Sequence, residues 1–173
     1  MPADRTSTDP ITTPLAPGST RITDPQEFLK LSGDQLDEIF RRATVGNLPQ
    51  GEGEGTAIVA PGTAVSDDIA RFVHIFQWKG KVFERDPNNP SHGWLKNRIL
   101  LFGSKAVVAD VSKGTSWFDG KECIVLDYSH TSIVAQWVRD EIREVSPGIF
   151  LGLVYWGKEK DKAHRLIHFA LKF

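Results

Sequence analysis

The chain has 173 residues, 40% of them apolar and 25% charged, with a formal net charge of −1. A charge near zero excludes the positive field that attracts phosphate backbones, so nucleic acid is not expected as a partner. The single cysteine excludes an internal disulfide, and the absence of a secretion signal and of an apolar run of roughly 20 residues predicts a cytoplasmic protein without a membrane span.

The N-terminal segment differs in composition from the rest of the chain. Residues 1–22 carry four prolines, several threonines and few large apolar side chains. Such a segment buries too little apolar surface to offset the entropy lost when it is ordered. We therefore predict a flexible arm over 1–22 and a single domain over 23–173.

Two helix starts follow the arm. Asp24 precedes a proline and lies three residues before Glu27, and this pattern is typical of a capped first turn. Ser32 and Gln35 form a second capping pair ahead of apolar residues at helical spacing, and Gly46 closes that pattern. The start of the domain is therefore predicted to be helical.

Strand signals dominate after the helices. The glycine-rich run 51–55 leads into a β-branched segment and lacks the Lys-Ser or Lys-Thr of a phosphate-binding loop. A third helical pattern covers 66–77, and its end is also compatible with a strand. Further strands are predicted at 78–83, 97–102, 106–111, 122–128, 138–145, 149–156 and 165–173, with a loop at 87–93 and a short helix at 129–136.

Two turns join strands in this part of the chain. Asp119-Gly120 predicts a hairpin between 116–118 and 122–128, and Ser146-Pro147-Gly148 predicts a type II turn. Seven or eight successive strands lack the alternation with helices that a parallel sheet requires. The order predicts a mainly β fold, an antiparallel barrel with N-terminal helices and one short helix between late strands.

Aromatic residues on or beside these strands point to a ligand. The sequence holds five tryptophans and two tyrosines, and a barrel of this size can hold one small molecule among such side chains. A filled core needs the same residues, so the composition leaves both alternatives open.

Polar residues on the late strands are the candidate ligand contacts. On a strand, Arg139, Glu141 and Arg143 share one face, and Asp140 and Ile142 share the other. The arginine face is either a solvated ladder of charges or an inward surface that meets an anionic ligand group.

A proton-transfer site is another possibility. Asp127, Tyr128 and His130 supply an acid, a phenol and an imidazole within four residues, although the same order suits a strand end that leads into a helix cap. Cys123 lies in an apolar run, where a cysteine is usually an inert core residue.

The order of motifs resembles the calycin class of barrels, which includes lipocalins, fatty-acid carriers and nitrobindins. The run 51–55 is similar to the glycine-rich first strand of nitrobindin-like proteins, and 167–171 is similar to the strand that supplies their haem ligand. Their usual Gly-x-Trp lead is replaced here by Gly46-Asn47-Leu48. Residues 34–173 also resemble bacterial Gly-x-Trp-x-Gly-domain proteins, a match that implies architecture rather than activity.

These observations together predict a calycin-like barrel that binds a small, mostly apolar molecule and requires no cofactor. The residues expected to contact the ligand are Arg98, Tyr128, Arg139, Arg143, Tyr155 and His168, with Trp78, Trp117 and Trp156 as lining. The alternatives are a haem protein with His168 as iron ligand, an enzyme that uses Asp127, Tyr128 and His130, and an interaction module or homodimer that docks through the helix over 36–43.

Overall fold

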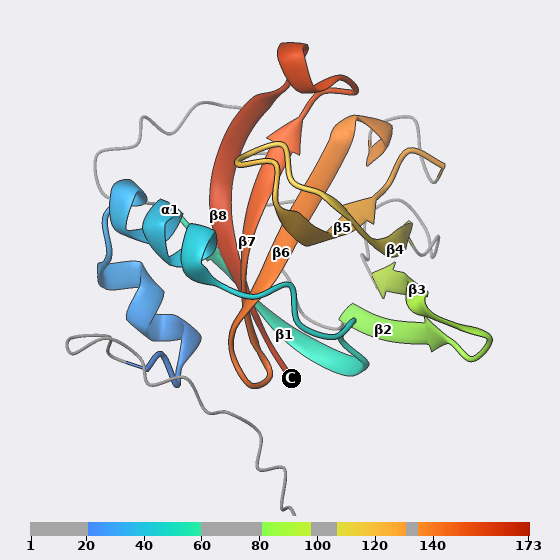
Figure 1. Cartoon of the computed structure of the whole chain (residues 1–173), viewed down its shortest axis with the longest axis horizontal. Coiled ribbons are helices and arrows are strands. Elements are labelled where there is room, and N and C mark those ends of the chain that lie inside the picture. The colour runs from blue at the N-terminus through green and yellow to red at the C-terminus, as the bar shows by residue number, and fades with distance from the viewer. Residues whose placement is uncertain (1–20, 60–80, 98–106, 131–134) are drawn as a thin grey trace, which may run out of the picture.

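The computed structural model describes residues 21–59, 81–97, 107–130 and 135–173. Eight strands form a closed antiparallel barrel in which each strand pairs with its sequence neighbours and the first closes against the last (Figure 1). The strands are β1 (Gly51–Ile58), β2 (Lys81–Asp86), β3 (Asn89–Asn97), β4 (Val107–Thr115), β5 (Glu122–Asp127), β6 (Val138–Ser146), β7 (Ile149–Trp156) and β8 (His164–Lys172). The predicted mainly β antiparallel barrel is confirmed.

Helices cover part of the outer surface. The 3-10 helix η1 (Pro25–Lys30) and helix α1 (Gly33–Arg42) begin at the two predicted capping boxes, Asp24 with Glu27 and Ser32 with Gln35. Their buried faces pack on the outer side of β7 and β8 (Figure 1). Two short 3-10 turns, η2 (Ala135–Trp137) and η3 (Lys160–Lys162), precede β6 and β8. No helix in the described segments is long and apolar enough to cross a membrane.

The connection between β2 and β3 is shorter than the loop predicted over 87–93. The Asp86 and Asn89 side chains accept hydrogen bonds from the backbone of Asn88 and Ser91, and this closes a tight turn from which β3 starts directly. Gly93 then allows close strand approach, since a Cβ there would lie 2.5 Å from the Glu84 carbonyl oxygen. These polar residues therefore belong to the strand ladder rather than to a loop.

The hairpin between β4 and β5 also differs from the prediction. Residues 116–118 were predicted as strand, but β4 ends at Thr115 and 116–121 form a wider connection. The Ser116 amide donates to the Lys121 carbonyl, and Gly120 adopts a φ of 75°. The wider connection turns Ser116 and Trp117 back toward the barrel wall, where Glu141 holds both.

Four predictions lie outside the described residues. They are residues 1–20 of the arm predicted over 1–22, the helical pattern over 66–77, the candidate lining residue Trp78 and the candidate contact Arg98. Most of the strand predicted over 97–102 lies there as well.

The barrel has two distinct ends. The turn end carries the β2–β3, β4–β5 and β6–β7 connections. At the loop end, β1, β3, β5 and β7 end, and β2, β4, β6 and β8 begin. Inward-facing side chains near the turn end include Phe83, Leu95, Ile124 and Phe150. Phe173 covers this end, with its ring centroid 5.2 Å from that of Phe83 and 5.8 Å from that of Phe150. Aromatic and aliphatic side chains therefore fill the half of the interior next to the turn end, which we call the turn half.

The other half of the interior, which we call the loop half, is also apolar. Its described inward side chains are Ala57, Ala109, Leu126, Val138, Val154 and Ile167, with the Phe169 ring on the strand position opposite Ala57. Apolar side chains therefore line both halves of the described interior.

Candidate functional site

A polar pair lies inside the loop half. Asp140 pairs across the sheet with Leu126 and Val154, both of which face inward, so its carboxylate points into the barrel. The Tyr128 hydroxyl donates to Asp140 Oδ2 over 3.2 Å, and both residues are fully buried. Burial of a carboxylate is costly unless hydrogen bonds compensate it, and such groups are commonly retained for function. The pair is therefore the leading polar feature of the interior.

The Tyr128 phenol stays protonated. Burial, the negative charge of Asp140 and the hydrogen bond to Asp140 together raise the pKa of Tyr128 well above its ordinary value of 10.0. The phenol is consequently a stable hydrogen-bond donor at neutral pH and is unsuited to act as a base.

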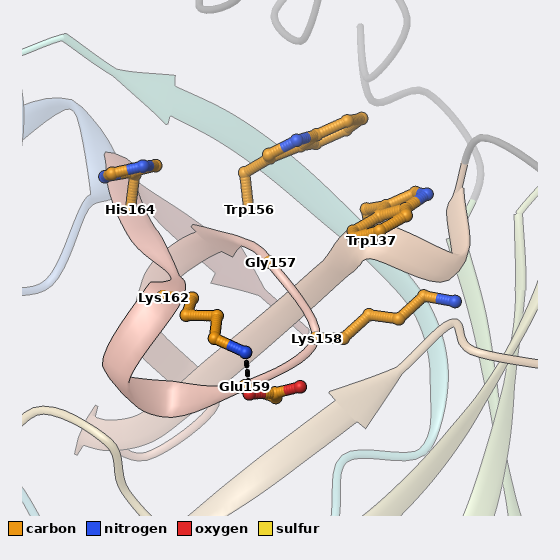
Figure 2. A pocket seen from close by; sticks show the side chains of 7 residues that line it. All are labelled: Trp137, Trp156, Gly157, Lys158, Glu159, Lys162 and His164. Carbon is orange, nitrogen blue, oxygen red and sulfur yellow. Dashed lines mark ion pairs between the residues drawn. The ribbon is translucent and has the colours of Figure 1, made fainter.

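A pocket opens at the same end of the barrel. It has a volume of about 310 Å³ and is lined by Trp137, Trp156, Gly157, Lys158, Glu159, Lys162 and His164 (Figure 2). Register places Val138 opposite Trp156 and Trp156 opposite His164, so the lining comes from adjacent ends of β6, β7 and β8. Of these residues, Trp156 was predicted from the sequence to line the ligand site.

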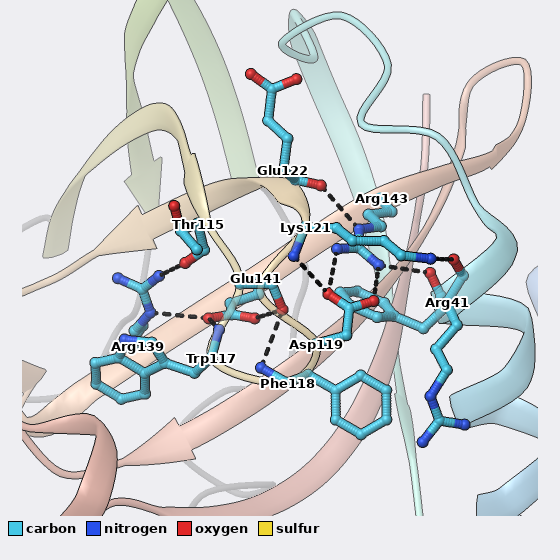
Figure 3. A network of polar contacts seen from close by, with 12 residues as sticks. Arg41, Thr115, Trp117, Phe118, Asp119, Lys121, Glu122, Arg139, Glu141 and Arg143 are labelled. Atoms are coloured by element: carbon cyan, nitrogen blue, oxygen red, sulfur yellow. Dashed lines mark hydrogen bonds and ion pairs between the residues drawn. The ribbon is translucent and has the colours of Figure 1, made fainter.

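The predicted arginine contacts occupy the opposite face of β6. Arg139 and Arg143 pair with Tyr155 and Leu151, which belong to the outer cluster beneath the helices. The hypothesis of an inward arginine face is therefore wrong for these strands, and Asp140 and Ile142 point inward instead. The outer face is nevertheless buried, because helix α1 and the β4–β5 connection cover it (Figure 3).

Arg143 joins three elements on this outer face. Its guanidinium donates to both Asp119 oxygens at 2.7 Å and to the carbonyl oxygens of Phe40 and Glu122 at 3.0 Å (Figure 3). The residue is 1% exposed and stacks over the Phe40 ring at 4.5 Å. The hydrogen bonds from Arg143 hold the pKa of Asp119 below its ordinary value. All of these contacts bind α1 and the β4–β5 connection to the barrel.

Glu141 organises the neighbouring part of the same surface. Its carboxylate accepts hydrogen bonds from the Ser116 hydroxyl at 2.6 Å, the Trp117 amide at 2.7 Å and Arg139 Nε at 3.0 Å. The Arg139 guanidinium lies over the Trp117 ring, and that ring contacts Tyr155 edge to face. Trp117, Arg139 and Tyr155 therefore meet one another, but outside the barrel.

His168 also faces outward. Its Nε2 lies 2.7 Å from Asp37 Oδ1 on helix α1, and Asp37 accepts two further hydrogen bonds from Arg165. The imidazole is therefore not presented to the barrel interior, and the described residues do not fit a haem held there by His168. The three side chains instead clamp α1 against β8.

The clamp makes stability depend on pH. Burial lowers the pKa of His168 from 6.5, opposed by its hydrogen bond to Asp37. A histidine with a lowered folded-state pKa binds protons more readily when unfolded, so stability is lost as the pH falls below about 6.5 toward the folded-state value. We expect urea unfolding at about pH 7.5 and pH 5.5 to show a smaller loss in His168→Asn than in the unmodified chain. An equal loss in both proteins would contradict this assignment.

The candidate proton-transfer residues do not converge. The Asp127 carboxylate accepts a hydrogen bond from the Ser129 amide, Tyr128 points into the barrel toward Asp140, and His130 is exposed. Burial raises the pKa of the Cys123 thiol to about 12, which suits an inert core residue. No cluster of three or more potential metal ligands occurs among the described residues.

Comparison with known proteins supports the architecture. No family model and no curated protein matches the chain. A solved structure, described as a protein from Thermomonospora curvata, superposes with a TM-score of 0.50 at 14% identity and covers 85% of this chain and 90% of its own. At this identity the likeness concerns the fold alone, an eight-stranded antiparallel barrel.

Proposed function

We propose that the loop half of the barrel binds a small, mostly apolar molecule, with the Tyr128–Asp140 pair as its polar contact. The observation that carries the proposal is the buried Tyr128–Asp140 pair, which lies among apolar inward-facing side chains of the loop half. Apolar walls with a few convergent polar groups are typical of small-molecule sites. The resemblance to calycins supports the same function, because that class carries ligands inside its barrels.

Burial of apolar surface is the main source of binding free energy for such a site. Burial of about 200 Å² of apolar ligand surface contributes roughly 5 kcal/mol before the costs of association. A ligand group that donates a hydrogen bond to Asp140 adds orientation, because a carboxylate accepts several hydrogen bonds. We therefore propose a ligand with a compact apolar body and one donor group.

A dye-binding measurement tests this proposal. We expect the neutral dye Nile red to gain fluorescence saturably with the full chain and to lose that gain in Ala109→Phe and Val154→Phe, which fill the loop half from β4 and β7. Two filling variants are used because either alone could destabilise the barrel. Circular dichroism checks that each is folded.

The control is a surface substitution. Leu29 is 41% exposed on η1, away from the interior, and Leu29→Ser should leave the dye signal unchanged. Saturable binding that persists in both folded filling variants would place the dye elsewhere and reject an interior site.

A further inference from the structure

The pocket at the loop end has a chemistry of its own, distinct from the barrel interior. Trp137 and Trp156 are 41% and 38% exposed, although tryptophan is highly buried on average. Figure 2 shows both indoles and the His164 imidazole along one side of the pocket, with Lys158 and Lys162 beside them. Exposed aromatic surface that gathers in a concavity is typical of a binding site.

The backbone beneath the pocket is well fixed. The Gly157 amide donates to the Trp137 carbonyl over 2.7 Å, which ties the end of β7 to the start of β6. Gly157 has a φ of 142°, and a Cβ there would lie 2.6 Å from the Ala163 Cα. The η3 turn closes the same loop through the bond from the Lys162 amide to the Glu159 carbonyl. The aromatic side chains therefore project from a constrained base.

The pocket carries a net positive charge. Lys162 pairs with Glu159 at 2.7 Å, so these two charges balance. The Lys158 ammonium lies 2.7 Å from the Gln136 amide oxygen and 4.6 Å from the centre of the Trp137 ring, and both of these partners are neutral. The charge of Lys158 is thus available to a ligand anion, next to an indole face.

From this arrangement we propose that the pocket binds a planar aromatic anion. The ring of the ligand stacks on the Trp156 or Trp137 indole, and its carboxylate or phosphate pairs with Lys158. A volume of about 310 Å³ lies at the lower limit for small-molecule sites, which favours one or two fused rings over a long chain. This site is independent of the proposed interior site.

Nuclear magnetic resonance of the tryptophan indole N–H groups tests the proposal on the full chain. We expect 2-naphthoate to shift the signals of Trp137 and Trp156, which are identified by their disappearance in Trp137→Phe and Trp156→Phe. We expect Lys158→Gln to weaken binding about 5- to 10-fold, because it removes a charge-assisted contact. Added salt should weaken binding to the unmodified chain more than to this variant.

Matched controls come from another part of the barrel. Trp94 on β3 forms an edge-to-face contact with His92 at 5.9 Å, and Lys96 beside it already pairs with Glu84 at 2.8 Å. Trp94→Ala and Lys96→Gln therefore remove an indole and a lysine that do not line the pocket, and both should leave 2-naphthoate binding unchanged.

Several outcomes would overturn the proposal. One is the absence of shifts at Trp137 and Trp156 up to about 5 mM 2-naphthoate. Another is that 2-naphthylmethylammonium or methyl glucoside binds as tightly as 2-naphthoate or more tightly. A third is that Lys96→Gln weakens 2-naphthoate binding as much as Lys158→Gln does. Ala109→Phe should not alter these shifts. If the folded Ala109→Phe variant loses these shifts, 2-naphthoate binds in the barrel interior. That result refutes a separate site and leaves the interior proposal intact.

Discussion

Replacement of Arg143 with alanine is expected to lower the free energy of unfolding by about 3 to 5 kcal/mol. The side chain is 1% exposed, and its removal leaves Asp119 without its bidentate partner. The Phe40 and Glu122 carbonyl oxygens lose their guanidinium donor in the same substitution. The loss is large because buried polar groups are left with their desolvation cost uncompensated.

Urea unfolding followed by tryptophan fluorescence measures this effect. Arg42→Ala is the control, since Arg42 pairs with Glu38 at the surface with 76% of its side chain exposed, and it should cost no more than about 1 kcal/mol. Arg143→Lys should recover little, because an ammonium cannot reproduce the paired bonds to a carboxylate. A loss below about 1 kcal/mol in Arg143→Ala would show that the cluster contributes little to stability.

Substitution of Gly152 with alanine is expected to destabilise the barrel by about 2 to 3 kcal/mol. Gly152 lies on β7 opposite Phe169 of β8, and a Cβ there would lie 2.3 Å from two atoms of the Phe169 ring. Phe169 is fully buried, so the ring can move aside only by displacing its neighbours. Thermal unfolding provides the measurement.

A second substitution identifies the cause of this loss. Phe169→Leu removes the ring, so Gly152→Ala should cost much less in that background than in the unmodified chain. The loss in the double variant is then smaller than the sum of the two single losses by the order of 1 to 2 kcal/mol. If the two losses simply add, crowding against Phe169 is not the reason for the glycine.

The sequence predicted the local structure of this protein well, for identifiable reasons. Asp24 and Ser32 begin their helices as expected, because capping depends on residues three positions apart. The predicted strand 149–156 coincides with β7, because a continuous apolar run after a Pro-Gly turn has few alternatives.

The inward face of β6 could not be predicted in the same way. Both faces of this strand carry charged residues, and Asp140, Glu141 and Arg143 are all buried. An alternating pattern assigns faces only when one face is apolar and the other is solvated. Here the outer face is covered by α1 and the 116–121 connection, which lie far away in the sequence. The sequence therefore did not predict that Tyr128 and Asp140 contact each other.

The pocket at the loop end was not predicted from the sequence for a similar reason. Trp137, Trp156 and His164 converge only because the register of three strands places their ends together. The count of tryptophans indicated a ligand but not its location. The available signal was an aromatic or histidine residue at each of three successive predicted strand boundaries, and it becomes useful only once the antiparallel order is known.

The way in which the barrel closes has a consequence for its assembly. Each described strand pairs with its neighbour in sequence, except that β1 must also find β8. The first seven pairings can form as local hairpins, whereas the last brings residues 51–58 beside residues 164–172 at the entropic cost of a long chain loop. We therefore expect closure of the barrel to be the slow event of folding, and a chain that has not yet closed exposes backbone groups at both outer edges of the sheet to other chains.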